Sequence, residues 1–122
     1  MRAPWFPLGS ILIAVAVTAG ALGAHLLRAR LEAPSLSLWE TGVRYLIVAG
    51  VGLLALGLAS ENRTHVGWTV AGIFLVAGAA LFSGTVAVLA LGGPRWLGAV
   101  TPFGGVLLIL GFVVTAVVAF RH

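Results

Sequence analysis

Four long apolar segments, separated by short polar connections, make up most of the chain. The third segment, residues 66–91, contains no charged residue, and as a helix it would extend for ~39 Å at about 1.5 Å per residue. This length exceeds the roughly 30 Å hydrocarbon core of a bilayer. A surface helix of a small soluble domain has a polar face, and this segment has none. The segment therefore predicts a helix that crosses a membrane.

The remaining apolar segments predict three further helices of the same kind. We expect an all-α membrane protein, with four transmembrane helices in an up-down-up-down antiparallel bundle that forms one domain over residues 1–122. The polar turn at residues 60–65 is short enough to require antiparallel neighbours. The first segment is expected to be a retained span and not a cleaved signal peptide. The predicted helices cover residues 8–27, 39–59, 66–91 and 102–120.

Local sequence signals set the expected helix ends. Pro34 disfavours a helix in the first connection, so Ser35 or Ser37 is expected to cap the second helix. Thr101 followed by Pro102 is typical of a helix cap and a first helical residue, and it predicts the start of the fourth helix.

Composition and charge support the membrane interpretation. Of 122 residues, 61% are hydrophobic and 8% are charged, whereas soluble domains average about 25% charged residues. The net charge of +4 comes from arginines scattered singly at the ends of apolar segments, which indicates interfacial anchors and no nucleic-acid partner. The arginines divide almost equally between the two membrane faces, which leaves dual topology open as an alternative. Arg28 and Arg30 favour a cytoplasmic first connection, with both termini outside. The absence of cysteine excludes disulfides, thiol nucleophiles and thiolate metal sites.

Small residues recur along the predicted helices, where they let two backbones approach closely. Ala16, Gly20 and Ala24 follow a four-residue spacing in the first segment, which indicates either a helix–helix seam or chance in a sequence rich in Ala and Gly. Ser83 and Thr85 lie within the third segment, where their hydroxyls could bond across helices or line a polar path. The interpretation that we favour is a bond to the carbonyl one turn earlier. The expected packing residues are Ala16, Gly20, Ala24, Gly50, Gly57, Gly78, Gly84, Gly104 and Gly105.

One group of polar residues is expected near a single membrane face once the hairpins form. Ionisable residues at membrane depth indicate function, and His25 could exchange a proton with Glu40. The structural alternative, which we favour, is an ion pair between Glu40 and Arg44 at i, i+4 spacing and a bond from His25 to a loop carbonyl. The candidate cluster consists of His25, Glu40, Arg44, Tyr45, Thr101 and Pro102.

Recognisable catalytic and cofactor motifs are absent from the sequence. There is no HExxH motif, the lack of Asp excludes a Ser/His/Asp set, and the GGP at residues 92–94 lacks the ending of a phosphate-binding loop. His25, His65 and His122 alternate between the two faces, which argues against haem ligation. We therefore expect no enzyme activity, no metal and no cofactor.

Four motifs, in order along nearly the whole chain, resemble one family of small integral membrane proteins. GALGAH at residues 20–25 is similar to its GAFGAH signature, and WETGVRY at residues 39–45 is similar to its W-[QE]-x-A-x-x-Y stretch. AGAALFSGT at residues 77–85 resembles AGxxLFSGS/T, and LGAVTPFGG at residues 97–105 resembles LGxxTPxGG. The chain thus resembles the domain of unknown function 423 family, the YwdK/YgdD-like small integral membrane proteins.

This resemblance implies a fold and a membrane location, but no established activity. Family members commonly carry a histidine four residues after the tyrosine, where this chain has Ala49. That difference weakens a two-histidine metal, haem or proton-relay site. The signature residues His25, Glu40, Tyr45, Thr101 and Pro102 coincide with the candidate cluster, which either stabilises the bundle or forms a small-ligand or ion site.

The sequence favours an accessory or assembly subunit of a larger membrane protein complex. The alternative is a small oligomeric transporter or channel that uses the His25, Glu40 and Arg44 cluster at one membrane face. A membrane enzyme acting on lipid or quinone has the least support. The expected location is the bacterial inner (plasma) membrane, and the expected partners are the lipid bilayer and other membrane subunits or further copies of the chain.

Overall fold

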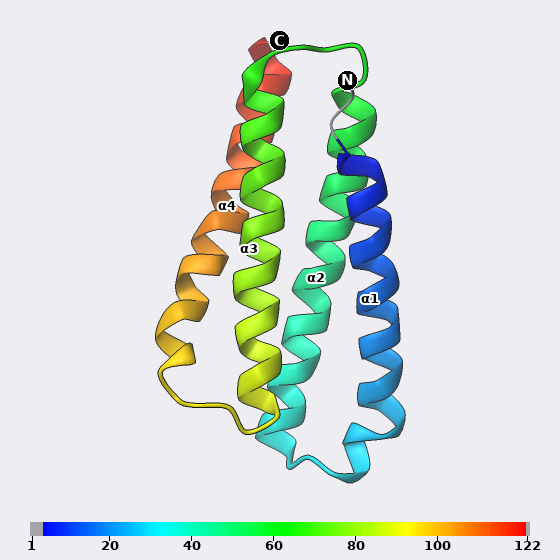
Figure 1. Cartoon of the computed structure of the whole chain (residues 1–122), viewed down its shortest axis with the longest axis vertical. Coiled ribbons are helices and arrows are strands. Elements are labelled where there is room, and N and C mark those ends of the chain that lie inside the picture. The colour runs from blue at the N-terminus through cyan, green and yellow to red at the C-terminus, as the bar shows by residue number, and fades with distance from the viewer. Residues whose placement is uncertain (1–3, 122) are drawn as a thin grey trace.

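The chain folds into four long α-helices, seen in a computed structural model that describes residues 4–121 (Figure 1). Each helix is long and apolar enough to cross a membrane, so the expected class, an all-α protein with four transmembrane helices, is confirmed for the described residues. A short 3-10 helix, η1 (Leu27–Ala29), follows the first helix. The long helices are α1 (Trp5–His25), α2 (Ala33–Ala59), α3 (Val66–Ala90) and α4 (Leu97–Arg121).

The helices lie in a row in which each runs opposite to the one before it (Figure 1). α2 and α3 are the inner helices, with α1 packed against α2 and α4 packed against α3. Phe6 of α1 lies beside Gly57 of α2 at one end of the first hairpin, and Gly23 lies beside Trp39 at the other end. Along the helix axes, the row has two ends, and we use "end of the row" in this sense. Both ends of the described chain lie at the end that carries the α2–α3 turn (Figure 1).

The core runs between the inner helices. Leu53 and Leu56 of α2 and Leu75 of α3 are its largest fully buried side chains. Trp5 from α1 and Leu108 from α4 extend this cluster towards the outer helices. The outward surface is also apolar, and Phe120, for example, is 93% exposed. Exposed apolar surface of this extent would be unfavourable in water and is expected in lipid.

The second helix begins at Ala33, earlier than predicted, because Pro34 does not prevent it from forming. Pro34 occupies the first turn, where its missing N–H group has no helical partner to lose. The N-cap is Glu32, whose side chain makes no capping hydrogen bond. The expected caps, Ser35 and Ser37, therefore lie inside the helix.

The fourth helix also begins earlier than predicted, at Leu97 instead of Pro102. Turn bonds lead into it, since the N–H of Leu97 donates to the Pro94 carbonyl at 3.2 Å and the N–H of Gly98 donates to the Arg95 carbonyl at 3.0 Å. The helix has thus started before the chain reaches Thr101. Pro102 lies inside α4, and Thr101 is not the cap that the sequence predicted.

Candidate functional site

The predicted polar cluster is distributed over three helices at the end of the row opposite the α2–α3 turn. His25 ends α1, whereas Glu40, Arg44 and Tyr45 lie in the first half of α2. Thr101 and Pro102 lie near the start of α4. The residues thus share one end of the molecule, but they do not form one contact site.

The charged members of this cluster are exposed. Within residues 4–121, the side chains of His25, Glu40 and Arg44 have neither a hydrogen bond nor an ion pair. The expected Glu40–Arg44 ion pair is therefore wrong. Such a pair on an exposed helix surface contributes little, because screening and side-chain entropy offset the attraction. These three residues do not define a buried or preorganised site.

Two of the uncharged members, Tyr45 and Thr101, make specific contacts with α3. The ring of Tyr45 meets that of Phe82 edge-on, with centroids 5.0 Å apart. The hydroxyls of Thr101 and Thr85 lie 2.6 Å apart and join α4 to α3. Thr85 also donates towards the Leu81 carbonyl at 2.6 Å, one turn earlier, as expected for a hydroxyl within a membrane helix. The predicted cluster therefore separates into two interhelical contacts.

Two further side-chain hydrogen bonds connect neighbouring helices. Ser83 Oγ donates to the Gly42 carbonyl oxygen at 2.8 Å in a buried contact between α3 and α2. This corrects the expectation that Ser83 bonds within its own helix. The close approach at Gly42, which has no side chain, brings that carbonyl within reach. Trp39 Nε1–H donates to the Ala19 carbonyl at 2.8 Å and joins α2 to α1.

Most of the predicted packing residues lie in helix seams. A Cβ at Gly50 would lie 2.6 Å from Ile13 Cγ1, and one at Gly78 would lie 2.7 Å from the Leu108 backbone nitrogen. Gly104 packs directly against Phe82 of α3. A Cβ at Gly57 would lie 2.8 Å from the Phe6 backbone nitrogen, which is an equally close contact. Ala16 is completely buried, and Gly20 and Gly105 lie in looser seam contacts.

Ala24 and Gly84 lie outside these seams. Ala24 is exposed, and the α1 seam passes through Gly23, where a Cβ would lie 2.8 Å from Trp39 Cδ1. Steps of four residues drift around a helix with 3.6 residues per turn, so Ala16, Gly20 and Gly23 follow one face better than the predicted spacing does. Gly84 has no atom within 4 Å of an added Cβ.

Gly84 instead borders an open groove of about 300 Å³. We call it the α2 groove, because it follows α2 between walls formed by α1 and α3. Its lining is almost entirely apolar and consists of Val15, Ala19, Trp39, Gly42, Val43, Leu46, Ala79, Ala80, Ser83, Gly84 and Ala87.

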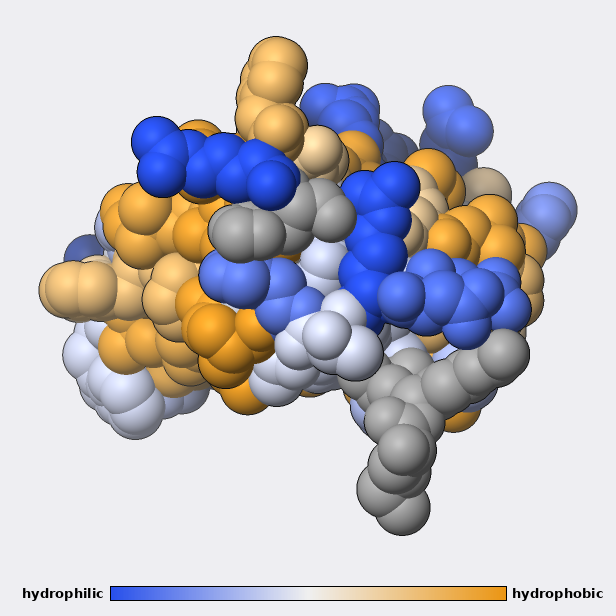
Figure 2. All heavy atoms as spheres, turned by 90° about the horizontal axis from the view of Figure 1, so that it is seen from above, coloured by the Kyte–Doolittle hydropathy of each residue, from blue (hydrophilic) through white to orange (hydrophobic). Residues whose placement is uncertain are grey.

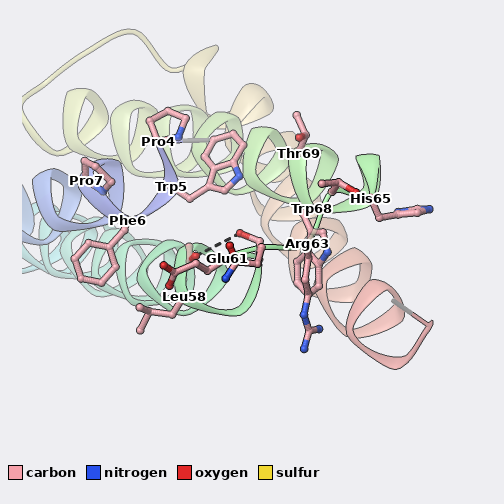
Figure 3. A pocket seen from close by; sticks show the side chains of 14 residues that line it. Pro4, Trp5, Phe6, Pro7, Leu58, Glu61, Arg63, His65, Trp68 and Thr69 are labelled. Atoms are coloured by element: carbon pink, nitrogen blue, oxygen red, sulfur yellow. Dashed lines mark hydrogen bonds between the residues drawn. The ribbon is translucent and has the colours of Figure 1, made fainter. Parts of the chain in front are cut away.

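A larger cavity of about 850 Å³ lies at the end of the row that carries the α2–α3 turn (Figure 3). We call it the tryptophan cavity, because Trp5 and Trp68 line it and are only 6% and 2% exposed. In the described part of the chain, neither indole N–H has a hydrogen-bond acceptor. The full lining is Pro4, Trp5, Phe6, Pro7, Gly57, Leu58, Ser60, Glu61, Asn62, Arg63, Thr64, His65, Trp68 and Thr69.

Two polar side chains shape the tryptophan cavity. The Arg63 guanidinium carbon lies 5.5 Å from the centre of the Trp68 ring, within the range of a cation–π contact. His65 Nδ1 accepts a hydrogen bond from the Gly67 N–H at 3.0 Å and caps α3. Among residues 4–121, no three His, Cys, Asp or Glu side chains come close enough together to hold a metal.

Sequence reasoning did not identify this cavity. Trp5 reads as an interfacial anchor, and the segment at residues 60–65 reads as a hairpin turn. The available signal was a pair of tryptophans beside the ends of two helices that share one membrane face. Only the packing of α1, α2 and α3 shows that both indoles are buried and line one cavity.

Comparison with known proteins places this chain in a family. The family model described as "Protein of unknown function (DUF423)" matches residues 19–105. A UPF0382 membrane protein of Staphylococcus saprophyticus is 41% identical over 115 residues, which cover 93% of this chain and 94% of that protein. The UPF0382 membrane protein YwdK of Bacillus subtilis is 35% identical over 116 residues, covering 94% of each. No solved structure matches. The chain belongs to the DUF423 family of bacterial membrane proteins.

Proposed function

We propose that this protein is an accessory or assembly subunit that binds a transmembrane helix of another membrane protein through the α2 groove. The observation that carries this proposal is the open space at Gly84. Among the helical glycines of the described chain, this one alone has no atom within 4 Å of an added Cβ. The internal packing of the protomer therefore does not explain the glycine there.

The chemistry of the α2 groove suits a helix in a bilayer. Ala80, Gly84 and Ala87 line the α3 wall at spacings of four and three residues, so their short side chains lie on one helix face. Helix association in lipid relies on close van der Waals packing, which small residues permit. Glycine lowers helix stability by about 1 kcal/mol relative to alanine, a cost that a bound helix would offset.

The groove differs from another place where nonadjacent helices approach. Between α4 and α2, the Phe112 ring fills the space over Gly52, and its Cζ would lie 2.6 Å from an added Cβ. No aromatic ring from α1 or α3 lines the α2 groove, and Trp39 from α2 forms part of its border. This contrast supports an external occupant for the α2 groove.

A transporter or channel role has less support. It depends on His25, Glu40 and Arg44, whose exposed side chains make no hydrogen bond or ion pair in the described chain. Four helices in a row also enclose no central pathway within one protomer. The subunit proposal does not require these residues.

The proposal is tested by mild purification of the tagged protein from native membranes, followed by mass spectrometry of the intact assembly. We expect a stoichiometric complex with another membrane protein. Gly84→Leu should release that partner, because the added side chain occupies the groove. The matched control, Ala116→Leu, alters an exposed position of α4 outside the groove and should retain the partner.

Two outcomes would contradict the proposal. One is a stand-alone species, or an assembly of this chain alone, recovered from native membranes. The other is a partner that remains bound to Gly84→Leu as well as to the control. Thermal unfolding of both variants in detergent confirms that the comparison uses folded protein.

A further inference from the structure

The proposed binding of a partner helix in the α2 groove involves none of the residues that line the tryptophan cavity. Figure 2 looks onto this end of the row and shows hydrophilic side chains gathered there, with hydrophobic side chains around them. In Figure 3, Trp5 and Trp68 approach the cavity from α1 and α3. This end is therefore a polar, concave surface at the expected level of the lipid headgroups, where tryptophan is enriched in membrane proteins.

The unsatisfied polar groups of this cavity are hydrogen-bond donors. An indole nitrogen donates and does not accept. The nitrogen atoms of Trp5 and Trp68 are buried and have no acceptor among the described residues. Because an unpaired buried donor costs free energy, an oxygen atom that reached either nitrogen would be stabilised by it.

Three backbone carbonyls beside the cavity already accept a hydrogen bond. The carbonyl of Leu56 accepts from the Ser60 N–H at 2.9 Å, and that of Leu58 accepts from the Glu61 N–H at 3.3 Å. The Gly57 carbonyl accepts from Ser60 Oγ at 3.4 Å. These three carbonyls at the end of α2 already have a donor, whereas the two buried indole donors have no acceptor among the described residues.

Positive charge reaches the same cavity from α1, α3 and Arg63. α1 and α3 both begin there and helix N-termini carry partial positive charge, whereas α2 ends there and its C-terminus carries partial negative charge. At the start of α3, the N–H groups of Gly67 and Trp68 are already bonded to His65. α1 has no side-chain cap at Pro4. Arg63 adds a full positive charge above Trp68. Glu61 also lines the cavity, so an anion is expected on the side of Arg63 and the two indoles.

We propose that the tryptophan cavity binds a phosphate oxyanion, carried by the phosphodiester of a membrane phospholipid or present as free phosphate. A tetrahedral phosphate offers several oxygens in different directions, which suits two indole donors on separate helices and a guanidinium. The exposed apolar side chains of Phe6 and Leu58 border the cavity and supply contacts for the glycerol or acyl part of a lipid.

Native mass spectrometry of the full chain in mild detergent tests this site with three probes. Short-chain phosphatidylglycerol carries the phosphodiester, diacylglycerol of the same chain length lacks it, and inorganic phosphate carries the oxyanion without lipid. We expect one phosphatidylglycerol per chain, bound at least about a hundredfold more tightly than diacylglycerol, because diacylglycerol lacks all three proposed contacts and each is worth about fivefold to tenfold.

Three substitutions remove the proposed contacts. Trp5→Phe and Trp68→Phe each remove one N–H and keep an aromatic ring, and Arg63→Gln removes the charge. Each is expected to weaken phosphatidylglycerol binding about fivefold to tenfold. The matched controls, Trp96→Phe and Arg95→Gln, alter exposed residues at the opposite end and should bind as the unaltered protein does. Arg63 is itself exposed, so Arg63→Gln keeps the test valid even where an indole variant fails to fold.

The inorganic phosphate arm distinguishes the two sources of the oxyanion. Displacement of phosphatidylglycerol by millimolar phosphate assigns the site to free phosphate as well, and lack of displacement assigns it to the lipid. Equal binding of phosphatidylglycerol and diacylglycerol would overturn the proposal, as would cavity variants that bind like their controls. Gly84→Leu should retain phosphatidylglycerol, so this result is independent of the α2 groove.

Discussion

The two ends of the helix row differ in how they hold their polar groups. At one end, His25, Glu40 and Arg44 are exposed and unpaired within residues 4–121. At the other end, Trp5 and Trp68 are buried around a cavity, with donors that lack an acceptor in the described chain. Ionisable residues are easily noticed in a membrane sequence. Burial, however, determines whether a bound ligand stabilises a polar group.

The largest effect on the difference between the two ends is expected when a substitution displaces Trp5 from its buried position. Gly72 of α3 lies directly against the Trp5 ring, so a larger side chain cannot fit beneath the indole. We expect Gly72→Leu to reduce the free energy of unfolding by about 3 kcal/mol, as overpacking in a core does. Denaturation in detergent, followed by tryptophan fluorescence, measures the change. Gly84→Leu is the control, since its Cβ faces open space, and an equal loss in both variants would contradict this packing.

A smaller effect is expected from the uncharged contacts near the exposed end. Ser83→Ala removes the buried hydrogen bond to the Gly42 carbonyl and leaves that oxygen without this donor. The expected loss is about 1 kcal/mol, in the range of interhelical hydrogen bonds in membranes. Ser10→Ala is the control, because Ser10 bonds the Phe6 carbonyl within its own exposed helix surface. If both variants unfold alike, Ser83 does not contribute to the α2–α3 seam.

The smallest effects are expected from the charged residues at the exposed end. His25→Ala, Glu40→Gln and Arg44→Gln should each change the free energy of unfolding by less than about 0.5 kcal/mol, because no described contact is lost. The same denaturation assay measures them. If any one of the three lowers the free energy of unfolding by more than about 1 kcal/mol, its side chain makes a stabilising contact and the contrast between the two ends is wrong.

The sequence predicted the helices more fully than the polar contacts. Residues 66–91 nearly coincide with α3, because a long apolar run without proline has only one low-energy backbone arrangement in lipid. The starts of α2 and α4 were predicted too late, because Pro34 is harmless in a first turn and α4 starts ahead of Pro102. Proline marks a constraint on one hydrogen bond, not the position of a helix end.

The candidate site was harder to predict for a physical reason. Whether Ser83 bonds its own helix or Gly42 depends on the distance between two helices, which one helix's sequence does not contain. The burial of Trp5 likewise depends on Gly72, a residue far along the chain. The chemical type of each residue was readable from the sequence, whereas its partner required the tertiary structure.

The pattern of helix pairing has a consequence for how the protein is made. α1 packs with α2, and the hydrogen bond from Trp39 to the Ala19 carbonyl joins these two helices. α3 packs with α4, and the hydroxyls of Thr85 and Thr101 join these two. Each hairpin is thus formed by neighbours in synthesis order. We expect the insertion machinery to release the chain as two preassembled hairpins, with the Ser83–Gly42 bond formed as they meet in the bilayer.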